Sequence, residues 1–269
     1  MEFLISRTKR SYEFNMVKSH WHPSYELYYL VSGHCKMFIN HTLYYLKAGD
    51  MILISPGEIH RTTYHSSPVN ERITLSFDKE YLDAMTESCG SKMTDYLFRT
   101  TKVSIPAGSK SYAEELIRKM VYEETSKDGY SDMMKRNYLY ELLVFLSRCQ
   151  EVRSETVKLD VAEKAIEEAA EFIYHNYINP ITLLEVANRI HMSPTYFSRK
   201  FKTVTGFGFK EYLTNIRIRE AAYLLINTQK SVTDIAVECG FGDGNYFGDA
   251  FKKIKGVSPR TFRKRKGIV

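Results

Sequence analysis

Two short stretches of this sequence, fifty residues apart, carry the same pattern. Residues 196–203 read YFSRKFKT and residues 246–253 read YFGDAFKK, and in each an aromatic pair is followed four positions later by a third aromatic residue. This spacing is typical of one face of a helix. The positions that match at this separation are Phe197 and Phe247, Phe201 and Phe251, Gly206 and Gly256, and Tyr212 and Phe262. We therefore expect the C-terminal part of the chain to contain one helical unit twice.

Residues that favour helix starts indicate what this unit is. Thr182 and Glu185 have the T-x-x-E spacing of a capping box, in which each side chain accepts from a free backbone donor of the first turn. The helix LLEVANRI and the turn HM follow. Ser193 and Pro194 then suit the N-cap and the first turn of a second helix. This order predicts a helix-turn-helix unit.

The second copy follows the same plan. Ser231 and Asp234 bracket the start of its first helix, GFG forms its turn, and Asp243 is the expected N-cap of its second helix. The matching alanines, Ala187 and Ala236, are separated by 49 residues rather than 50. We therefore expect the second turn to be one residue longer than the first. A long helix around KEYLTNIRIREAAYLLINT joins the two copies.

The two faces of the second helix in the first copy differ in chemistry. The predicted buried stripe is Tyr196, Phe197, Phe201 and Val204. The opposite face carries Thr195, Ser198, Arg199 and Lys202. Arginine reads guanine, and serine or threonine can reach either kind of base, so this face suits a DNA major groove. For the aromatic stripes taken alone, a merely structural duplicated core is the alternative.

The excess positive charge lies in the same region. The chain has a net charge of +6, and residues 162–269, with 17 Lys and Arg against 11 Asp and Glu, account for all of it. The last 19 residues hold eight basic residues and no acidic one. A solvated basic tail is one interpretation of such a run. Combined with two capped helix-turn-helix units, the asymmetry favours a polyanionic partner, double-stranded DNA.

The stretches MSPTYFSRKFKTVTG and GFGDGNYFGDAFKKIKGVSPRTFRK resemble the helix-turn-helix signatures of the AraC/XylS transcription regulators over about 100 residues. The resemblance implies a seven-helix module that places two recognition helices in successive major grooves. The base-reading residues it implies are Thr195, Ser198, Arg199, Lys202, Gly244, Asn245, Gly248 and Asp249. The phosphate-contacting residues it implies are Lys252, Lys253, Arg260 and Arg263. The sequence departs from the family pattern at Gly208–Phe209, where Ser–Pro is frequent, and at Asp249, where Arg is frequent.

The N-terminal half has a different period. Residues 1–106 contain short β-branched and aromatic segments separated by turn residues, which is typical of a β-meander or a β-barrel. Residues 109–149 carry apolar residues at helical intervals and predict a helical hairpin. We expect an effector-binding and dimerisation domain over 1–150, a linker over 151–161 and a DNA-binding domain over 162–269. The expected fold class is two-domain α+β, a cupin-like barrel with a hairpin followed by an all-α domain.

The barrel segment also resembles the two cupin motifs. HWHPSYE has the H-x-H-x3-E pattern, formed by His20, His22 and Glu26, and GDMILISPGEIH ends in His60. In metallocupins these four positions are the metal ligands. Residues 20, 22 and 26 share one parity along a strand and are expected to point into the barrel together. The leading glycine of the first motif is replaced by Phe14.

Three interpretations of this group remain open. A bound transition metal would make the barrel an enzyme or a metal sensor. Alternatively, His20, His22, Glu26 and His60, with Tyr28 in the pocket wall, hydrogen-bond an organic effector such as a sugar. A structural polar cluster is the third. Since cupin-like domains in the resembled family mostly bind small organic ligands, we favour an effector without a metal or other cofactor.

The predicted function is that of a non-enzymatic, sequence-specific transcription activator controlled by a small molecule, possibly a carbohydrate. RNA polymerase is an expected partner, and the helices of residues 109–149 are expected to cover the barrel and to form a homodimer. The alternatives are a metal-binding cupin fused to a DNA-binding module and a constitutive architectural DNA binder. No apolar run is long enough for a signal peptide or a membrane span, which predicts a cytoplasmic, nucleoid-associated protein without a membrane partner. The four dispersed cysteines are expected to be core thiols.

Overall fold

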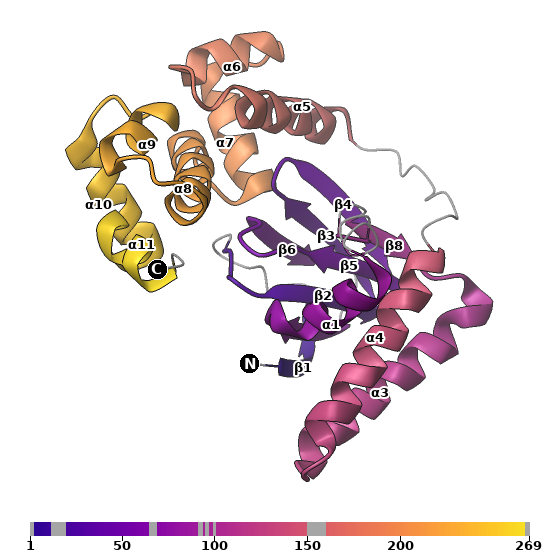
Figure 1. Ribbon diagram of the computed structural model, residues 1–269. Coiled ribbons are helices and arrows are strands. Elements are labelled where there is room, and N and C mark those ends of the chain that lie inside the picture. The colour runs from indigo at the N-terminus through magenta and orange to yellow at the C-terminus, as the bar shows by residue number, and fades with distance from the viewer. Residues whose placement is uncertain are drawn as a thin grey trace. The chain divides into compact units, whose positions relative to one another are not determined.

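The structure, a computed structural model, describes residues 3–11, 20–64, 69–90, 94, 97–98, 101–149 and 160–266 (Figure 1). The described residues divide into two compact units, one mainly from the N-terminal and one mainly from the C-terminal part of the chain. This agrees with the predicted two-domain fold class, and the exact domain boundaries stay a prediction. Residues 151–159 of the predicted linker lie outside the described residues. Each unit has its own core and is treated separately below.

The N-terminal unit contains two antiparallel sheets. Its strands are β1 (Phe3–Arg10), β2 (Tyr25–Ser32), β3 (His34–Ile39), β4 (Thr42–Lys47), β5 (Asp50–Ile54), β6 (His60–Tyr64), β7 (Asn70–Phe77) and β8 (Lys102–Ser104). The larger sheet has the order β1-β7-β2-β5-β8 and the smaller one β4-β3-β6. The arrangement is cupin-like, as predicted, but over the described residues the strands form two sheets rather than one closed barrel.

The two faces of the larger sheet bury different sets of residues because side chains alternate along each strand. One face contributes Leu27, Tyr29, Leu53, Leu75 and Phe77 to a core that also contains helical residues. The other face contributes Tyr28, Leu30, Ile52 and Ile54 to a second core, shared with Cys35, Met37, Ile39 and Tyr64 of the smaller sheet. We call the first the helix-covered face and the second the inner face.

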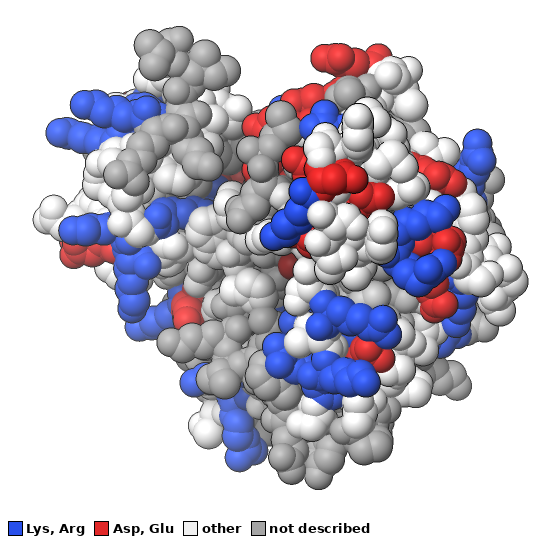
Figure 2. All heavy atoms as spheres, turned by 90° about the horizontal axis from the view of Figure 1, so that it is seen from below, with Lys and Arg blue, Asp and Glu red and all other residues white. Residues whose placement is uncertain are grey.

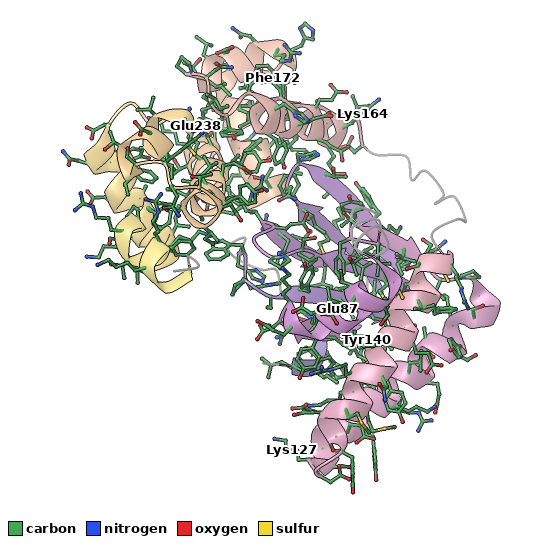
Figure 3. The ribbon with its side chains drawn as sticks, in the orientation of Figure 1. Glu87, Lys127, Tyr140, Lys164, Phe172 and Glu238 are labelled. Carbon is green, nitrogen blue, oxygen red and sulfur yellow. The ribbon has the colours of Figure 1, made fainter. Side chains whose placement is uncertain are left out.

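The helix-covered face is buried by α3 (Lys110–Ser126) and α4 (Ser131–Cys149), which form the hairpin predicted for residues 109–149 (Figure 1). A 3₁₀ turn, η1 (Ala107–Ser109), leads into the hairpin. At its tip Lys127 adopts the left-handed conformation that ends α3 (Figure 3). The side chains that α3 and α4 bury toward the sheet include Leu116, Ile117, Met120, Leu139, Leu142, Leu143 and Leu146. The expected role as a cover of the barrel is therefore confirmed.

One helix was not expected. The sequence-based prediction of strands throughout residues 1–106 is wrong at α1 (Glu80–Cys89). Tyr81, Leu82 and Met85 of this helix are buried in the same core as the helix-covered face. Their spacing is helical, and the apolar surface of the sheet provides the partner that stabilises so short a helix.

The C-terminal unit contains seven helices among the described residues, in agreement with the predicted module. They are α5 (Val161–Asn176), α6 (Leu183–Arg189), α7 (Pro194–Thr205), α8 (Phe209–Asn227), α9 (Val232–Glu238), α10 (Gly244–Lys255) and α11 (Pro259–Lys266). The predicted caps of the two helix-turn-helix units are present. The capping side chains that accept a hydrogen bond from a backbone N–H of the first turn are Thr182, Ser193, Ser231 and Asp243.

Helix α8 joins the two repeats and forms the centre of this unit. Its N-terminal half contacts α7, with the Phe201 and Tyr212 rings 5.3 Å apart between centroids. Its C-terminal half contributes Ile218, Ala221 and Leu225 to the core that contains Phe247 and Phe251 of α10. A helix that is buried on both sides in this way shows no single apolar stripe, unlike the amphipathic helices around it.

The backbone confirms the duplication. In the first turn the Met192 N–H donates to the Ala187 carbonyl at 2.9 Å, and in the second the Phe241 N–H donates to the Ala236 carbonyl at 2.9 Å. Both pairs are offset by 49 residues, whereas the caps Ser193 and Asp243 are offset by 50. The additional residue predicted for the second turn is therefore Gly242.

Two details of the predicted core are wrong. Tyr196 was expected in the buried stripe, but 40% of its surface is exposed, at the first turn of α7. Cys89 was expected to be a core thiol but is exposed at the end of α1, whereas the thiols of Cys35, Cys149 and Cys239 are free and buried. None of the helices that the structure describes is both long and apolar enough to cross a membrane.

The turn of the second repeat provides a test of the fold. Gly240 has a φ of +82°, and a Cβ there would lie 2.5 Å from the carbonyl oxygen of Ile178. We expect Gly240→Ala to lower the free energy of unfolding by about 1–3 kcal/mol, since both the left-handed conformation and the close approach oppose a side chain. Urea unfolding followed by far-ultraviolet circular dichroism measures the change.

Gly242→Ala is the matched control, because Gly242 has no positive φ and no atom within 4 Å of an added Cβ. Its free energy of unfolding should change by less than about 0.5 kcal/mol. Equal losses in the two variants would contradict the conformational role of Gly240.

Candidate functional site

The second helices of the two repeats, α7 and α10, present corresponding faces to solvent. Thr195, Arg199 and Lys202 are exposed on α7, and Ser198 is half-buried. The corresponding surface of α10 carries Gly244, Asn245 and Asp249, all exposed, with Gly248 half-buried. The eight residues predicted to read bases therefore lie on the surface, on the faces opposite the buried phenylalanines of each helix. What they contact stays a prediction.

An exposed tyrosine begins each of these helices and was not predicted as part of the surface. Tyr196 is 40% exposed and Tyr246, its equivalent in the second repeat, is 55% exposed. The Arg199 guanidinium carbon lies 6.0 Å from the centre of the Tyr196 ring. The Tyr246 hydroxyl is hydrogen-bonded to Thr214 Oγ1 at 3.3 Å. Their equivalence across the repeat was the signal that could have identified them.

The residues predicted to contact phosphates differ in how exposed their side chains are. Lys252, Lys253 and Arg260 are exposed at the end of α10 and the start of α11. Arg263 is half-buried, and its guanidinium donates to the carbonyls of Leu225 at 3.2 Å and Lys230 at 2.6 Å. Arg263 therefore stabilises the end of α8 and the loop after it, a structural role that sequence analysis did not predict.

The length of α8 sets the scale of the separation between the two recognition helices. Its 19 residues correspond to about 28 Å at about 1.5 Å per residue. Successive major grooves on one side of a duplex repeat at about 34 Å. A rigid central helix of this length is therefore suited to presenting two helices to neighbouring grooves.

On the face drawn in Figure 2, Lys and Arg side chains form several groups with Asp and Glu side chains between them. Basic residues that act in recognition are thus better identified from their helices than from the overall surface. Lys252, Lys253 and Lys255 all lie in the last turn of α10, where cations also complement the helix dipole.

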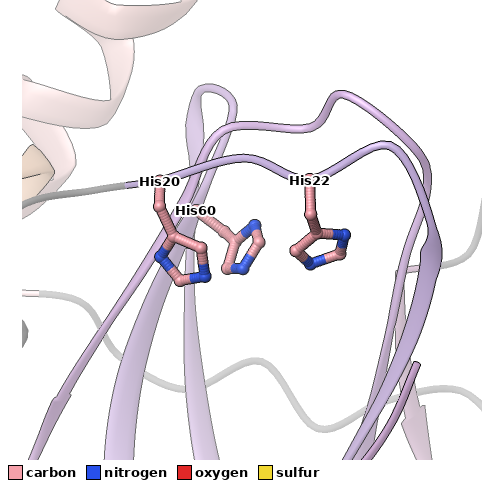
Figure 4. A group of neighbouring side chains, drawn as sticks. All are labelled: His20, His22 and His60. Carbon is pink, nitrogen blue, oxygen red and sulfur yellow. The ribbon is translucent and has the colours of Figure 1, made fainter. Parts of the chain in front are cut away.

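The N-terminal unit brings together three histidines. Potential ligand atoms of His20, His22 and His60 all lie within 4.8 Å of one another (Figure 4). His20 and His60 form an isolated antiparallel bridge through two backbone hydrogen bonds of 3.1 and 2.9 Å. The prediction that these residues converge is confirmed. The expectation that His20, His22 and Glu26 lie along one strand is wrong. His20 and His22 precede β2, and only Glu26 belongs to that strand.

The environment of His60 keeps its imidazole neutral. His60 is 2% exposed, and burial is the main reason that its pKa falls to about 4. Its Nδ1–H donates to the Glu58 carbonyl at 3.0 Å. Nε2 is buried and has no hydrogen-bond partner among the described residues. The tautomer therefore leaves the Nε2 lone pair available to a ligand.

His22 and Glu26 form a pair beside it. The His22 Nδ1–H donates to the Ser24 carbonyl at 2.7 Å, and Nε2 lies 3.1 Å from Glu26 Oε2 in a geometry that is not well aligned for a hydrogen bond. Burial lowers the pKa of His22, but the Glu26 carboxylate outweighs it, so the pKa is raised. Burial raises the pKa of Glu26, and the neighbouring His22, His60 and Arg72 outweigh it, so the pKa is lowered.

Tyr28 does not act as an open pocket wall. It is fully buried, and its hydroxyl is hydrogen-bonded to Tyr64 Oη at 3.2 Å and lies 3.6 Å from Cys35 Sγ. Its ring belongs to the core between the two sheets. Of the five residues predicted to bind an effector, His20, His22, Glu26 and His60 gather in one place, whereas Tyr28 belongs to the buried core between the sheets.

Sequence analysis missed the polar residues of β7. Thr74 lies opposite Tyr28 and Ser76 opposite Glu26 in the pairing of β7 with β2, so both side chains share the inner face with those residues. The Ser76 hydroxyl is hydrogen-bonded to Ser24 Oγ at 2.8 Å. The alternation in NERITLSF was a signal, but a polar face of a strand normally indicates solvent. Here the apolar face is covered by helices and the polar one faces the interior.

The same cluster fits a metal by the chemistry of its donors. Imidazole nitrogens and a carboxylate suit zinc, copper, iron or nickel. The imidazole rings of His22 and His60 are each oriented by an Nδ1–H bond to a backbone carbonyl. Metal-binding imidazoles are commonly oriented by bonds of this kind. His20, His22, His60 and Glu26 are the residues that would hold such an ion.

Family comparisons agree with this architecture. Residues 4–143 match the model of the AraC-like ligand binding domain, and residues 186–265 match that of a helix-turn-helix domain. The first match covers about half of the chain, and the second includes both helix-turn-helix turns. The matched ranges correspond to the two structural units.

Relatives with similarity along most of the chain are also regulators. The HTH-type transcriptional regulator YisR of Bacillus subtilis is 26% identical over 89% of this chain and 85% of its own length. The lactose operon transcription activator of Staphylococcus xylosus is 26% identical over 82% and 76%, respectively. The melibiose operon regulatory protein of Escherichia coli is 25% identical over 93% and 84%. The chain therefore belongs to the AraC family of transcription regulators, with an AraC-like ligand-binding domain followed by a DNA-binding helix-turn-helix domain.

Proposed function

We propose that this regulator reads its operator with both helix-turn-helix units and activates transcription in response to a carbohydrate bound in the N-terminal unit. The observation that carries the proposal is the duplication itself, because two capped helices present equivalent exposed faces at the two ends of one rigid helix. The protein is proposed to act by binding, without catalysing a reaction.

The two recognition helices differ in the contacts they can make. Arg199 gives α7 a side chain suited to bidentate recognition of guanine. On α10, Asn245 suits adenine and Asp249 suits the amino group of cytosine, but a carboxylate opposes approach to a polyanion. We infer that α7 is the stronger anchor, with Lys252 and Lys253 of α10 contacting phosphates. Operator changes opposite residues 195–202 should then weaken binding more than changes opposite 245–252.

A sugar effector is supported by the chemistry of the inner face. The buried Nε2 of His60, the pair of His22 and Glu26, and the hydroxyls on the inner face offer both donors and acceptors, and the same face carries buried apolar side chains. Sugar sites require this combination of apolar surface and convergent polar groups. Two of the relatives are named for the lactose and melibiose operons, which supports the same class.

Activation is proposed to proceed by a population shift. An effector that binds one arrangement of the two units more tightly favours that arrangement, and with it engagement of both operator sites and recruitment of RNA polymerase.

We propose that the protein works as a homodimer, bound to DNA of the nucleoid in the cytoplasm. Tyr122 and Met133, 66% and 57% exposed on α3 and α4, are candidates for the dimer surface. Sedimentation equilibrium of Met133→Glu would reveal dissociation.

A metal-responsive regulator is the second candidate. The observation that favours it is the pair of buried Nε2 atoms of His22 and His60, neither of which has a hydrogen-bond partner among the described residues. A transition metal bound there would polarise or charge the site and replace the organic effector as the signal.

Base reading and phosphate binding can be separated by mutation. Arg199→Ala should reduce binding to an operator selected from random DNA by about 1–3 kcal/mol and relax the preference at one base pair. Lys252→Ala should weaken binding to all sequences and lower the salt slope by about 1, because one fewer counterion is released. Fluorescence anisotropy over a range of salt concentrations measures both effects.

Lys200→Ala is the control on the same helix, because Lys200 is half-buried and lies 3.6 Å from Asp160. It should leave base preference unchanged. If Arg199→Ala lowered specific and nonspecific affinity equally, its assignment as a base reader would be wrong.

The effector assignment predicts linked changes in stability and DNA binding. A sugar present at 100 times its Kd should stabilise the full chain by about 2.7 kcal/mol, and it should change operator affinity in the same concentration range. Thermal-shift and anisotropy titrations test the two effects. A constitutive architectural DNA binder would show neither, whatever small molecule was added.

Metal analysis separates the two candidate signals. For an organic effector we expect substoichiometric transition metal in protein purified without chelator, as measured by mass spectrometry of the elements. One metal per chain that is lost in His22→Ala but kept in His34→Ala would establish the second candidate, because His34 is exposed at the start of β3, outside the cluster.

A further inference from the structure

Arg72 is a half-buried positive charge of the N-terminal unit. It lies opposite Leu30 in the pairing of β7 with β2. Residues directly opposite in an antiparallel pair point to the same face. Leu30 is fully buried in the core between the two sheets. Arg72 therefore points to the inner face, the one that also carries Glu26 and Tyr28.

The guanidinium of Arg72 makes a ring contact and no ion pair among the described residues. Its central carbon lies 5.5 Å from the centre of the Tyr28 ring, which provides a cation–π contact. Its Nε is buried without a hydrogen-bond partner, and Arg72 forms no ion pair with any residue that the structure describes. A buried donor without a partner costs free energy, and a charged group costs more. The unpartnered Nε–H of Arg72 therefore lowers the stability of the fold unless a ligand accepts a hydrogen bond from it.

The nearby carboxylate is already paired. The field of Arg72 reaches Glu26, but the Oε2 atom of Glu26 lies 3.1 Å from Nε2 of His22. Arg72 itself forms no ion pair with Glu26. The inner face therefore presents a guanidinium that can bind an anionic group of a ligand.

The surrounding groups suit the remainder of such a ligand. The hydroxyls of Thr74 and Ser76 share the inner face with Arg72 at positions two and four residues along β7. The unpartnered Nε2 of His60 can accept a hydrogen bond from a hydroxyl. Hydroxyl partners together with a guanidinium are the complement of a polyol that also carries an acid group.

We propose that the effector is an anionic sugar whose carboxylate or phosphate binds Arg72. The guanidinium presents paired N–H donors that match two oxygens of either group. This inference rests on the proposed carbohydrate effector and specifies its charge. Hexuronates and hexose phosphates supply the same anionic chemistry and are distinguished by the experiment.

The experiment compares matched sugars on the full chain by isothermal titration calorimetry. The probes are glucose, galactose, glucuronate, galacturonate, glucose 6-phosphate and galactose 6-phosphate. We expect at least one acidic sugar to bind about tenfold or more tightly than its neutral parent, the factor typical of a charged hydrogen bond. Arg72→Gln should abolish this preference and leave binding of the neutral parent within about twofold. Preference for the uronate or for the phosphate identifies the acid group.

Arg7→Gln is the matched control. Arg7 lies opposite Ile73, hence on the other face of the same sheet, is exposed and pairs with Glu71 at 2.7 Å. The Arg7→Gln substitution removes the same charge as Arg72→Gln, but this variant should keep the preference for the acidic sugar. Arg72→Gln should fold with an unchanged or higher melting temperature in the absence of sugar, because no ion pair is lost.

The outcomes separate this inference from the function on which it rests. Neutral sugars that bind as tightly as the acidic ones, or a preference that survives Arg72→Gln, would overturn the inference and leave the carbohydrate effector in place. No binding of any probe, neutral or acidic, would contradict both. A preference lost equally in Arg7→Gln would assign it to net charge rather than to Arg72.

Discussion

Burial of one face of the five-stranded sheet by the α3–α4 hairpin is the constraint on which the N-terminal unit depends. Leu27, Leu75 and Phe77 lie on that face, and their apolar surface is removed from water by helical leucines. Because side chains alternate, the other face of the same strands is released from forming the main core. It can carry charged and hydroxyl groups between the two sheets, and the histidine cluster lies at its edge.

Helix α8 has the corresponding role in the C-terminal unit. Its two halves belong to the cores of different repeats, with Tyr212 beside Phe201 in one and Leu225 with Phe251 in the other. The two repeats therefore form one compact unit and are not separate modules joined by a flexible linker. A separation fixed by a buried helix costs no ordering entropy when both recognition helices engage DNA, and this favours simultaneous binding.

The accuracy of prediction followed the range of the interactions involved. The caps at Thr182, Ser193 and Asp243 were predictable because each depends on a backbone donor two or three residues away. Helix α1 was missed because its stability comes from the sheet it covers. The exposure of Tyr196 was missed because helical periodicity identifies a face but not how far the neighbouring helices extend over it.

The sequence by itself determined the two-part architecture, the duplicated helix-turn-helix unit, the extra residue in its second turn and the faces of α7 and α10 that lie on the surface, since these follow from local capping and periodicity. Its resemblance to the two cupin motifs also identified His20, His22, Glu26 and His60 as one group. Only the tertiary structure decided which face of β7 is internal, and so that Arg72, Thr74 and Ser76 belong with them. The physical reason is that the polar face of a strand with alternating polar and apolar residues is normally expected to face solvent. In β7 the polar face points inward instead, because helices cover the apolar face. That cover, the α3–α4 hairpin, lies more than thirty residues further along the chain.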